Sequence, residues 1–209
     1  MLYKLGFYLG QLAYANKGEP YDKGDVEVYA YGFEMFWENV LSLGLMLAIG
    51  IFIGCGYETV FFLLAFLSMR SSAGGYHAKT SGRCFLSSLV IYSIFLFLLF
   101  LIPGWLVGLL SISCVCFSIV PILKLAPFRD EIHTPLGQRL SKIMRKRTIV
   151  IFTIQVVAIV GLSGFITASQ QLEFPITDII PRLCLSISLG LLTSVLSLIV
   201  AKIEAKNRS

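Results

Sequence analysis

Long apolar segments separated by short polar ones run along most of the chain. The apolar segments are Val40–Met69, Phe85–Ile102, Trp105–Leu123, Ile149–Ala168 and Leu183–Ala201. A helix needs about 20 predominantly apolar residues to cross a membrane. The pattern therefore predicts an all-α, polytopic membrane protein made of one domain, residues 1–209.

The first apolar segment, residues 39–69, is longer than one span requires and has a charge near its middle. A single straight helix would place Glu58 deep in lipid, which is costly. We therefore predict a helical hairpin that turns at Gly54 and Gly56. With two spans in 85–123 and two in 149–201, the chain has about six transmembrane helices.

Residues 1–38 predict interfacial helices before the first span. Leu2, Leu5, Leu9 and Leu12 recur near helical spacing. This spacing predicts a short amphipathic helix, which lies on the membrane surface or packs on the rest of the protein. The polar and aromatic residues 21–38 predict a second interfacial helix that leads into the membrane.

Composition and charge agree with this interpretation and orient the spans. The chain is 56% hydrophobic and 14% charged, whereas soluble domains carry roughly 25% charged residues. The net charge of +5 is unevenly placed: residues 70–84, 124–148 and 202–209 are basic, but 54–58, 103–104 and 169–181 contain no Lys or Arg. The positive-inside rule then predicts that both termini are cytoplasmic. We expect no nucleic-acid partner.

The longest polar loop, residues 124–148, is a candidate partner site. Thr134 and Pro135 are suited to the start of a helix. The following cations include Arg139, Lys142, Arg145 and Lys146. Such a loop can contact a bilayer with anionic lipids, or it can capture an acidic segment of a peptide.

The polar stretch from Arg70 to Cys84 holds the candidate chemistry. His77 is one of two histidines, and Cys84 is the cysteine, of five, that lies beside polar residues. An imidazole can take a thiol proton, and the thiolate can then attack a carbonyl. The alternative is that His77 is an interfacial polar residue and Cys84 a small residue at a helix start.

Cys84 directly precedes the apolar run from Phe85, so we expect it in the first turn of that span. The partial positive charge and unpaired N–H groups of a helix start, together with Arg83, favour a thiolate and an oxyanion. His77 and Cys84 would lie about 10.5 Å apart along a straight helix. A direct hydrogen bond therefore requires a bend, which Gly74, Gly75 and Gly82 permit.

The remaining cysteines suggest no site. Cys55, Cys114, Cys116 and Cys184 lie in apolar runs and are predicted to be small buried hydrophobic residues. No Cys-x-x-Cys pair suggests zinc, so we expect neither metal nor cofactor. The residue that orients His77 stays open among Glu34, Glu38, Glu58, Ser72 and Thr80.

The pattern Arg70…Gly74-Gly75-Tyr76-His77-Ala78…Cys84 resembles the accessory gene regulator protein B (AgrB) family. The Tyr31-Gly32-Phe33-Glu34 segment and the Ala126-Pro127…Pro135-Leu136 pattern agree with it. The resemblance implies a membrane cysteine endopeptidase of Gram-positive bacteria that processes an AgrD-type precursor of a cyclic autoinducing peptide. It implies Cys84 as nucleophile and His77 as general base, supported by motif positions that include Arg70, Gly74 and Gly75. Lys79 and Arg83, within the same stretch, are further candidates for substrate binding.

Two other function classes remain open at this point. One is a membrane peptide transporter or channel subunit, although the spans offer few polar residues to line a path. The other is a membrane acyltransferase that uses the same His and Cys with a lipid donor. A homodimer is a family-level expectation, to which Gly50 and Gly54 add a Gly-x-x-x-Gly pair.

Overall fold

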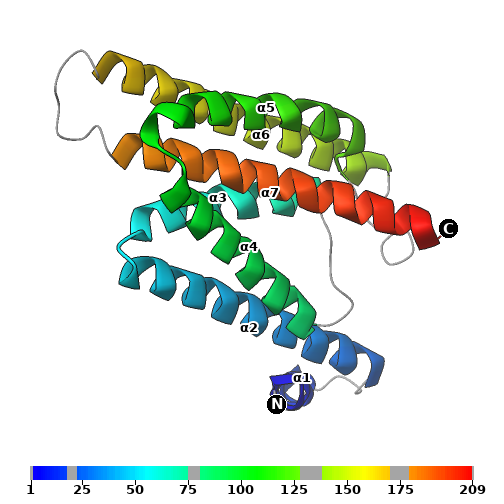
Figure 1. The fold of residues 1–209 in the computed structure, drawn as a ribbon. Coiled ribbons are helices and arrows are strands. Elements are labelled where there is room, and N and C mark those ends of the chain that lie inside the picture. Colours follow the sequence, from blue (N-terminus) through cyan, green and yellow to red (C-terminus); the bar gives the residue numbers. More distant parts are fainter. Residues whose placement is uncertain (1, 18–22, 75–80, 128–137, 170–178, 209) are drawn as a thin grey trace. The chain divides into compact units, whose positions relative to one another are not determined.

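The chain folds into helices in all of the parts that the structure describes. The computed structural model describes residues 2–17, 23–74, 81–127, 138–169 and 179–208 (Figure 1). Their helices are α1 (Leu2–Lys17), α2 (Lys23–Phe52), α3 (Gly56–Ala73), α4 (Ser81–Leu101), α5 (Gly104–Leu125), α6 (Gln138–Ser169) and α7 (Ile179–Arg208). No strand occurs in these ranges, so the predicted all-α fold is confirmed.

Several of these helices suit a bilayer. Among the described residues, four helices are long and apolar enough to cross a membrane: Gly24–Phe52, Gly104–Leu125, Ser141–Phe165 and Ile179–Lys206. Phe85–Leu101 of α4 is a shorter apolar helix. The chain is therefore a polytopic membrane protein. We predicted about six spans, and α3 falls outside this set because Glu58 and Arg70 lower its apolar character.

Two compact units make up the chain, and each is described by itself. The first unit contains residues 1–46 and 78–89, and the second contains residues 47–77 and 90–209. Both α2 and α4 contribute residues to each unit.

The turn of the predicted hairpin lies between α2 and α3. Gly54 has φ +80°, a conformation that residues with a side chain rarely adopt. Its N–H donates to the Ile51 carbonyl at 3.1 Å, and the Cys55 N–H donates to the Gly50 carbonyl at 2.7 Å. The helix before the turn begins earlier than expected, because α2 is continuous from Lys23. The predicted interfacial helix over 21–38 and the first arm of the hairpin are thus one helix.

The long basic loop is shorter than its polar composition suggested. α5 continues to Leu125 and α6 already begins at Gln138, so residues 138–148 are helical. Their Arg, Lys and Leu residues are good helix formers, which allows the helix to continue beyond its apolar part. Thr134 and Pro135, the expected helix start, lie outside the described residues.

Helix α7 forms the core of the second unit. α3, α5 and α6 all pack against it (Figure 1), and every residue from Cys184 to Leu191 is buried. α3 and α7 approach closely at Gly190, where an added Cβ would lie 2.7 Å from the Phe62 carbonyl oxygen of α3. Ser194 strengthens this contact, since its hydroxyl donates to the Phe66 carbonyl at 3.0 Å.

An aromatic cluster joins α3 to the second-unit part of α4. The rings of Phe62 and Phe95 stack with centroids 4.1 Å apart. The Tyr92 and Thr59 hydroxyls are hydrogen-bonded at 2.8 Å. Gly50 packs directly against both Thr59 and Tyr92. Its close packing is therefore within the chain, and the Gly-x-x-x-Gly pair no longer supports a homodimer.

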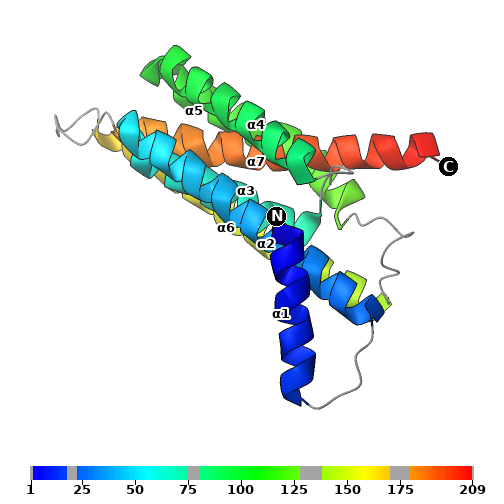
Figure 2. The same cartoon turned by 90° about the horizontal axis from the view of Figure 1, so that it is seen from below.

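In the first unit, α1 packs against α2 through glycines. Gly6 faces Ala30 and Phe33, and Gly10 faces Val26; Figure 2 shows α1 crossing beside α2 at a steep angle. Of the two positions predicted for this N-terminal helix, packing against the rest of the protein is therefore the one observed. The opposite side of α1 still exposes three large apolar side chains, those of Leu5, Tyr8 and Leu12.

Candidate functional site

The described flanks of the 70–84 stretch are the end of α3 and the start of α4. α3 ends at Ala73, and Gly74 follows with φ +82° while its N–H donates to the Arg70 carbonyl at 3.1 Å. α4 begins at Ser81, so Cys84 is its fourth residue. His77, Gly75 and Lys79 lie outside the described residues.

Cys84 lies in the first turn of α4, and this position bears on its chemistry. The first four N–H groups of a helix have no partner within it, and they carry its partial positive charge. A cysteine in this turn is in a setting that favours a thiolate. The side chains of Cys84 and Arg83 are not described, so the His77–Cys84 contact and the bend that it requires stay predictions.

The C-terminal half of α3 is held by polar contacts. The Arg70 guanidinium lies over the Phe66 ring, 5.5 Å from its centroid, a cation–π geometry. The Gln155 side chain of α6 donates from Nε2 to the Ala65 carbonyl at 2.9 Å and to the Ser68 hydroxyl at 3.0 Å. Among the described residues, Gln155 Oε1 has no hydrogen-bond partner.

The candidates for orienting His77 are differently placed. Ser72 is buried, and its hydroxyl donates to the Ser68 and Met69 carbonyls of its own helix. Glu58 is buried in the first turn of α3, at the end of the helix remote from Gly74. Glu34 and Glu38 are partly exposed on α2, and Thr80 lies outside the described residues. None of the described candidates is assigned to this role.

Glu58 instead belongs to a cluster that the sequence did not reveal. Its Oε1 lies 3.4 Å from Nη1 of Arg182 on α7. Nη2 of Arg182 donates to the Cys55 sulfur at 3.7 Å, and the guanidinium lies 5.5 Å from the Phe100 ring centroid. The signal that could have found it is an acidic residue within the first apolar segment and a basic residue directly before the last one, because intramembrane charges are generally paired.

The prediction of four buried cysteines is only partly right. Cys55 and Cys184 are buried, but Cys114 is intermediate and Cys116 is exposed. Cys114 and Cys116 lie on α5. An apolar setting does not require protein contact in a membrane helix, because lipid can supply it.

Four of the predicted substrate-binding cations lie at the start of α6. The side chains of Lys142, Arg145 and Lys146 are exposed. Arg145 Nη2 donates to the Leu123 carbonyl of α5 at 3.4 Å. Arg139 lies within the helix, but its side chain is not described. No His, Cys, Asp and Glu cluster suited to a metal occurs among the described residues.

Comparison with known proteins identifies the family. The family model for accessory gene regulator B matches residues 11–200. An AgrB-like protein of Clostridium acetobutylicum is 28% identical over 159 residues, which cover 75% of this chain and 68% of that protein. No solved structure matches the chain. Because the family match includes the central stretch and extends over nearly the whole length, the chain belongs to the accessory gene regulator B (AgrB) family.

Proposed function

We propose that this protein is a membrane-embedded cysteine endopeptidase that cleaves the C-terminal tail from an AgrD-type quorum-sensing precursor. It then promotes closure of the remaining peptide to a thiolactone or lactone. The observation that carries the proposal is the place of Cys84 in the first turn of α4, in a chain of the AgrB family. The catalytic residues are Cys84 and His77.

The first step is acyl transfer to the enzyme. His77 takes the Cys84 thiol proton, and the sulfur attacks the carbonyl carbon of the scissile peptide bond. Backbone N–H groups at the start of α4 stabilise the resulting oxyanion. His77 then gives its proton to the leaving amine, so that the tail departs and a Cys84 thioester remains.

The second step returns the enzyme to its starting state. A thiol or hydroxyl within the bound peptide loses its proton to His77 and attacks the thioester carbonyl. A ring bond forms, the Cys84–acyl bond breaks and the Cys84 sulfur regains a proton. A thioester and a thiolactone are similar in energy, so this exchange is near balance. The site must exclude water, because hydrolysis would release a linear peptide.

The remaining predicted residues support the site or recognise the substrate. Arg70, Gly74 and Gly75 shape the polar stretch. An acidic segment of the precursor is attracted by the cations, which are Lys79, Arg83, Arg139, Lys142, Arg145 and Lys146. These residues and both termini face the cytoplasm of the cell.

The test is a cleavage assay with the full chain in proteoliposomes and an AgrD-type precursor peptide. We expect cleavage and a peptidyl adduct on Cys84 by mass spectrometry. Cys84→Ala and Cys84→Ser should lose cleavage by about 10³-fold or more, since nucleophile and base act as a unit. Cys116→Ala is the matched control, because Cys116 is an exposed thiol on α5, and it should keep most activity.

The identity of the adduct separates the alternatives. A lipid acyl group on Cys84 would assign an acyltransferase instead. Peptide transport without any adduct would assign a transporter or channel subunit. Normal cleavage by the Cys84→Ala protein would overturn the peptidase proposal.

A further inference from the structure

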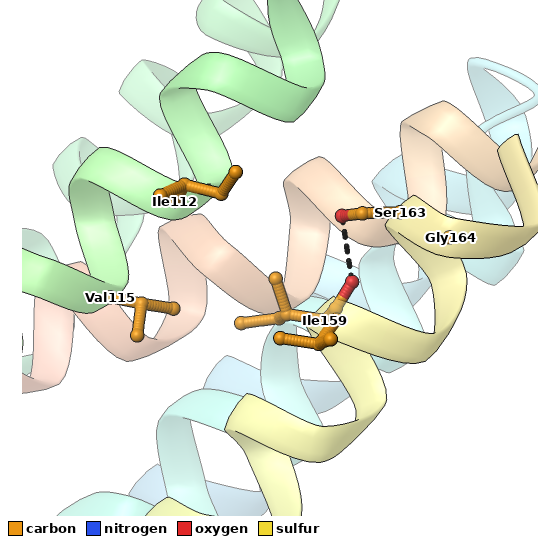
Figure 3. A pocket seen from close by; sticks show the side chains of 6 residues that line it. Ile112, Val115, Ile159, Ser163 and Gly164 are labelled. Carbon is orange, nitrogen blue, oxygen red and sulfur yellow. Dashed lines mark hydrogen bonds between the residues drawn. The ribbon is translucent and has the colours of Figure 1, made fainter. Parts of the chain in front are cut away.

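A cavity lies between α5 and α6, away from the 70–84 stretch. Its volume is about 340 Å³, within the range of small-ligand pockets. Figure 3 shows its lining, which comes from one face of each helix: Ile112 and Val115 of α5, with Ile159, Val160, Ser163 and Gly164 of α6. Both helices pack against α7, so they form a groove on the second unit.

The lining selects an apolar occupant. Its one hydroxyl, that of Ser163, already donates to the Ile159 carbonyl at 2.7 Å, the dashed line in Figure 3. A Cβ added at Gly164 would meet no atom within 4 Å, so this side of the cavity is open. Ile112 and Val160 at its rim are 55% and 60% exposed. These exposed apolar rims are typical of a surface in contact with acyl chains.

The groove has cations at one end. The Arg145 guanidinium of α6 reaches the Leu123 carbonyl in the last turn of α5, at 3.4 Å. This contact brings the C-terminal end of α5 and the start of α6 together. Lys124, Lys142 and Lys146 are exposed beside it along the two helices. Basic pockets between transmembrane helices bind anionic lipid headgroups.

A lipid tail that starts at the cations reaches the α5 side of the cavity. At 1.5 Å per residue, Val115 lies about 12 Å along α5 from Leu123, whereas Ile159 and Gly164 lie about 21 Å and about 28 Å along α6 from Arg145. One leaflet of the hydrocarbon core is about 15 Å thick. A lipid with its headgroup at the cations therefore reaches the α5 lining with the end of its acyl chain, and the α6 lining lies deeper.

We propose that α5 and α6 form a binding site for one anionic phospholipid, with its headgroup at Lys124, Lys142 and Arg145 and the end of one tail in the cavity. The proposal does not depend on the peptidase activity. It differs from general attraction to a charged bilayer, because it requires the cavity as well as the cations.

The test uses the purified full chain in mild detergent with phosphatidylglycerol and with phosphatidylcholine of the same acyl chains. Native mass spectrometry should show one retained phosphatidylglycerol at lipid concentrations that leave phosphatidylcholine unbound. Replacement of Lys142 and Arg145 by Gln should weaken retention about fivefold for each cation removed. Added salt should weaken it further.

The cavity is tested with Gly164→Leu, which adds a large side chain to its lining. Gly161→Leu is the matched control, because Gly161 is also an open glycine of α6 but does not line the cavity. Gly164→Leu should weaken phosphatidylglycerol retention at least threefold and Gly161→Leu should not. Thermal unfolding in phosphatidylcholine alone should be equal for the two, which shows that both fold.

Three results would overturn the proposal. One is equal retention of the two lipids by the wild type, and another is undiminished retention by Gly164→Leu. The third is a lipid-independent dimer that Gly164→Leu dissociates, which would assign the groove to a second copy.

Discussion

The guanidinium of Arg182 lies 3.4 Å from the carboxylate of Glu58, and the pair joins the first turns of α7 and α3. Glu58 is almost completely buried, whereas the Arg182 side chain is 38% exposed. The pair therefore sits at the edge of the apolar core, where one partner is shielded from solvent and the other is not. Removal of Arg182 would leave a buried carboxylate without its counter-ion.

Arg182→Met should destabilise the protein by about 1–3 kcal/mol. Loss of one partner of a fully buried pair costs about 3–5 kcal/mol, and the exposure of Arg182 reduces this. The double variant Glu58→Gln with Arg182→Met should recover part of the loss, since no buried charge remains. Unfolding in mixed detergent micelles measures the stability of the single and the double variant. Lys142→Gln, a substitution at an exposed position, is the control. If the loss of stability in the double variant equals the sum of the losses in Glu58→Gln alone and in Arg182→Met alone, the two side chains are not coupled.

Gly190→Ala should destabilise the contact between α3 and α7. The added Cβ would lie 2.7 Å from the Phe62 carbonyl oxygen and 2.9 Å from Ala65 Cβ, and overpacking of this kind costs about 1–3 kcal/mol. Gly108→Ala is the matched control, because its Cβ meets open space on α5. The midpoint of thermal unfolding distinguishes them. A Gly190→Ala protein as stable as Gly108→Ala would contradict the close approach.

Labelling in intact cells tests the orientation. A cysteine introduced at Lys142 or Lys206 should resist an impermeant thiol reagent from outside, whereas one at Glu173 should react. The reason is the alternation of basic and non-basic segments along the chain. Arg182 adds a cation directly after the non-basic segment 169–181, but this cation is paired with Glu58. The difference in charge between the basic and the non-basic segments therefore remains. The background variant carries Cys116→Ala, because Cys116 is exposed. Labelling of a cysteine at position 142 from outside the cell would mean that the orientation is opposite to the predicted one.

The proposed His77–Cys84 pair predicts a reactive thiol. Alkylation of Cys84 at pH 7 should be on the order of tenfold slower in His77→Ala, because an unassisted thiol is only a few per cent thiolate at this pH. His133→Ala, the other histidine, is the control and should not change the rate. The measurement is the modified fraction of Cys84 against time by mass spectrometry. Identical rates in wild type and His77→Ala would mean that the two residues do not form a dyad.

The helical fold and the turn at Gly54 could be predicted from the sequence because lipid makes apolar length a direct constraint on structure. The ends of helices could not be placed as well. α6 begins at Gln138 and α2 at Lys23, since a helix continues into water once it is nucleated and its residues allow it. Apolar length therefore indicates where a helix crosses the membrane better than where it begins.

The ion pair between Glu58 and Arg182 was not predicted from the sequence. Glu58 was expected at a turn because a charge deep in lipid is costly. Its partner, Arg182, lies on α7, more than 120 residues further along the chain. Only the packing of α3 against α7 brings them together. The His, Cys and glycines of the central stretch lie close together in the sequence, so the stretch could be proposed as a site from the sequence alone. The predicted contact between His77 and Cys84 requires a backbone bend, which residue spacing permits but does not fix.

The central place of α7 has a consequence for biosynthesis. α3, α5 and α6 leave the ribosome before the helix on which all three pack. The end of α7 lies 135 residues after the end of α3, and at about 5–20 residues per second their synthesis takes roughly 7–27 s. During this interval the earlier helices are in the bilayer without their shared partner, and Glu58 is there without Arg182. Assembly of the second unit is thus a late event, and the nascent chain is most exposed to quality-control proteases just before its last helix inserts.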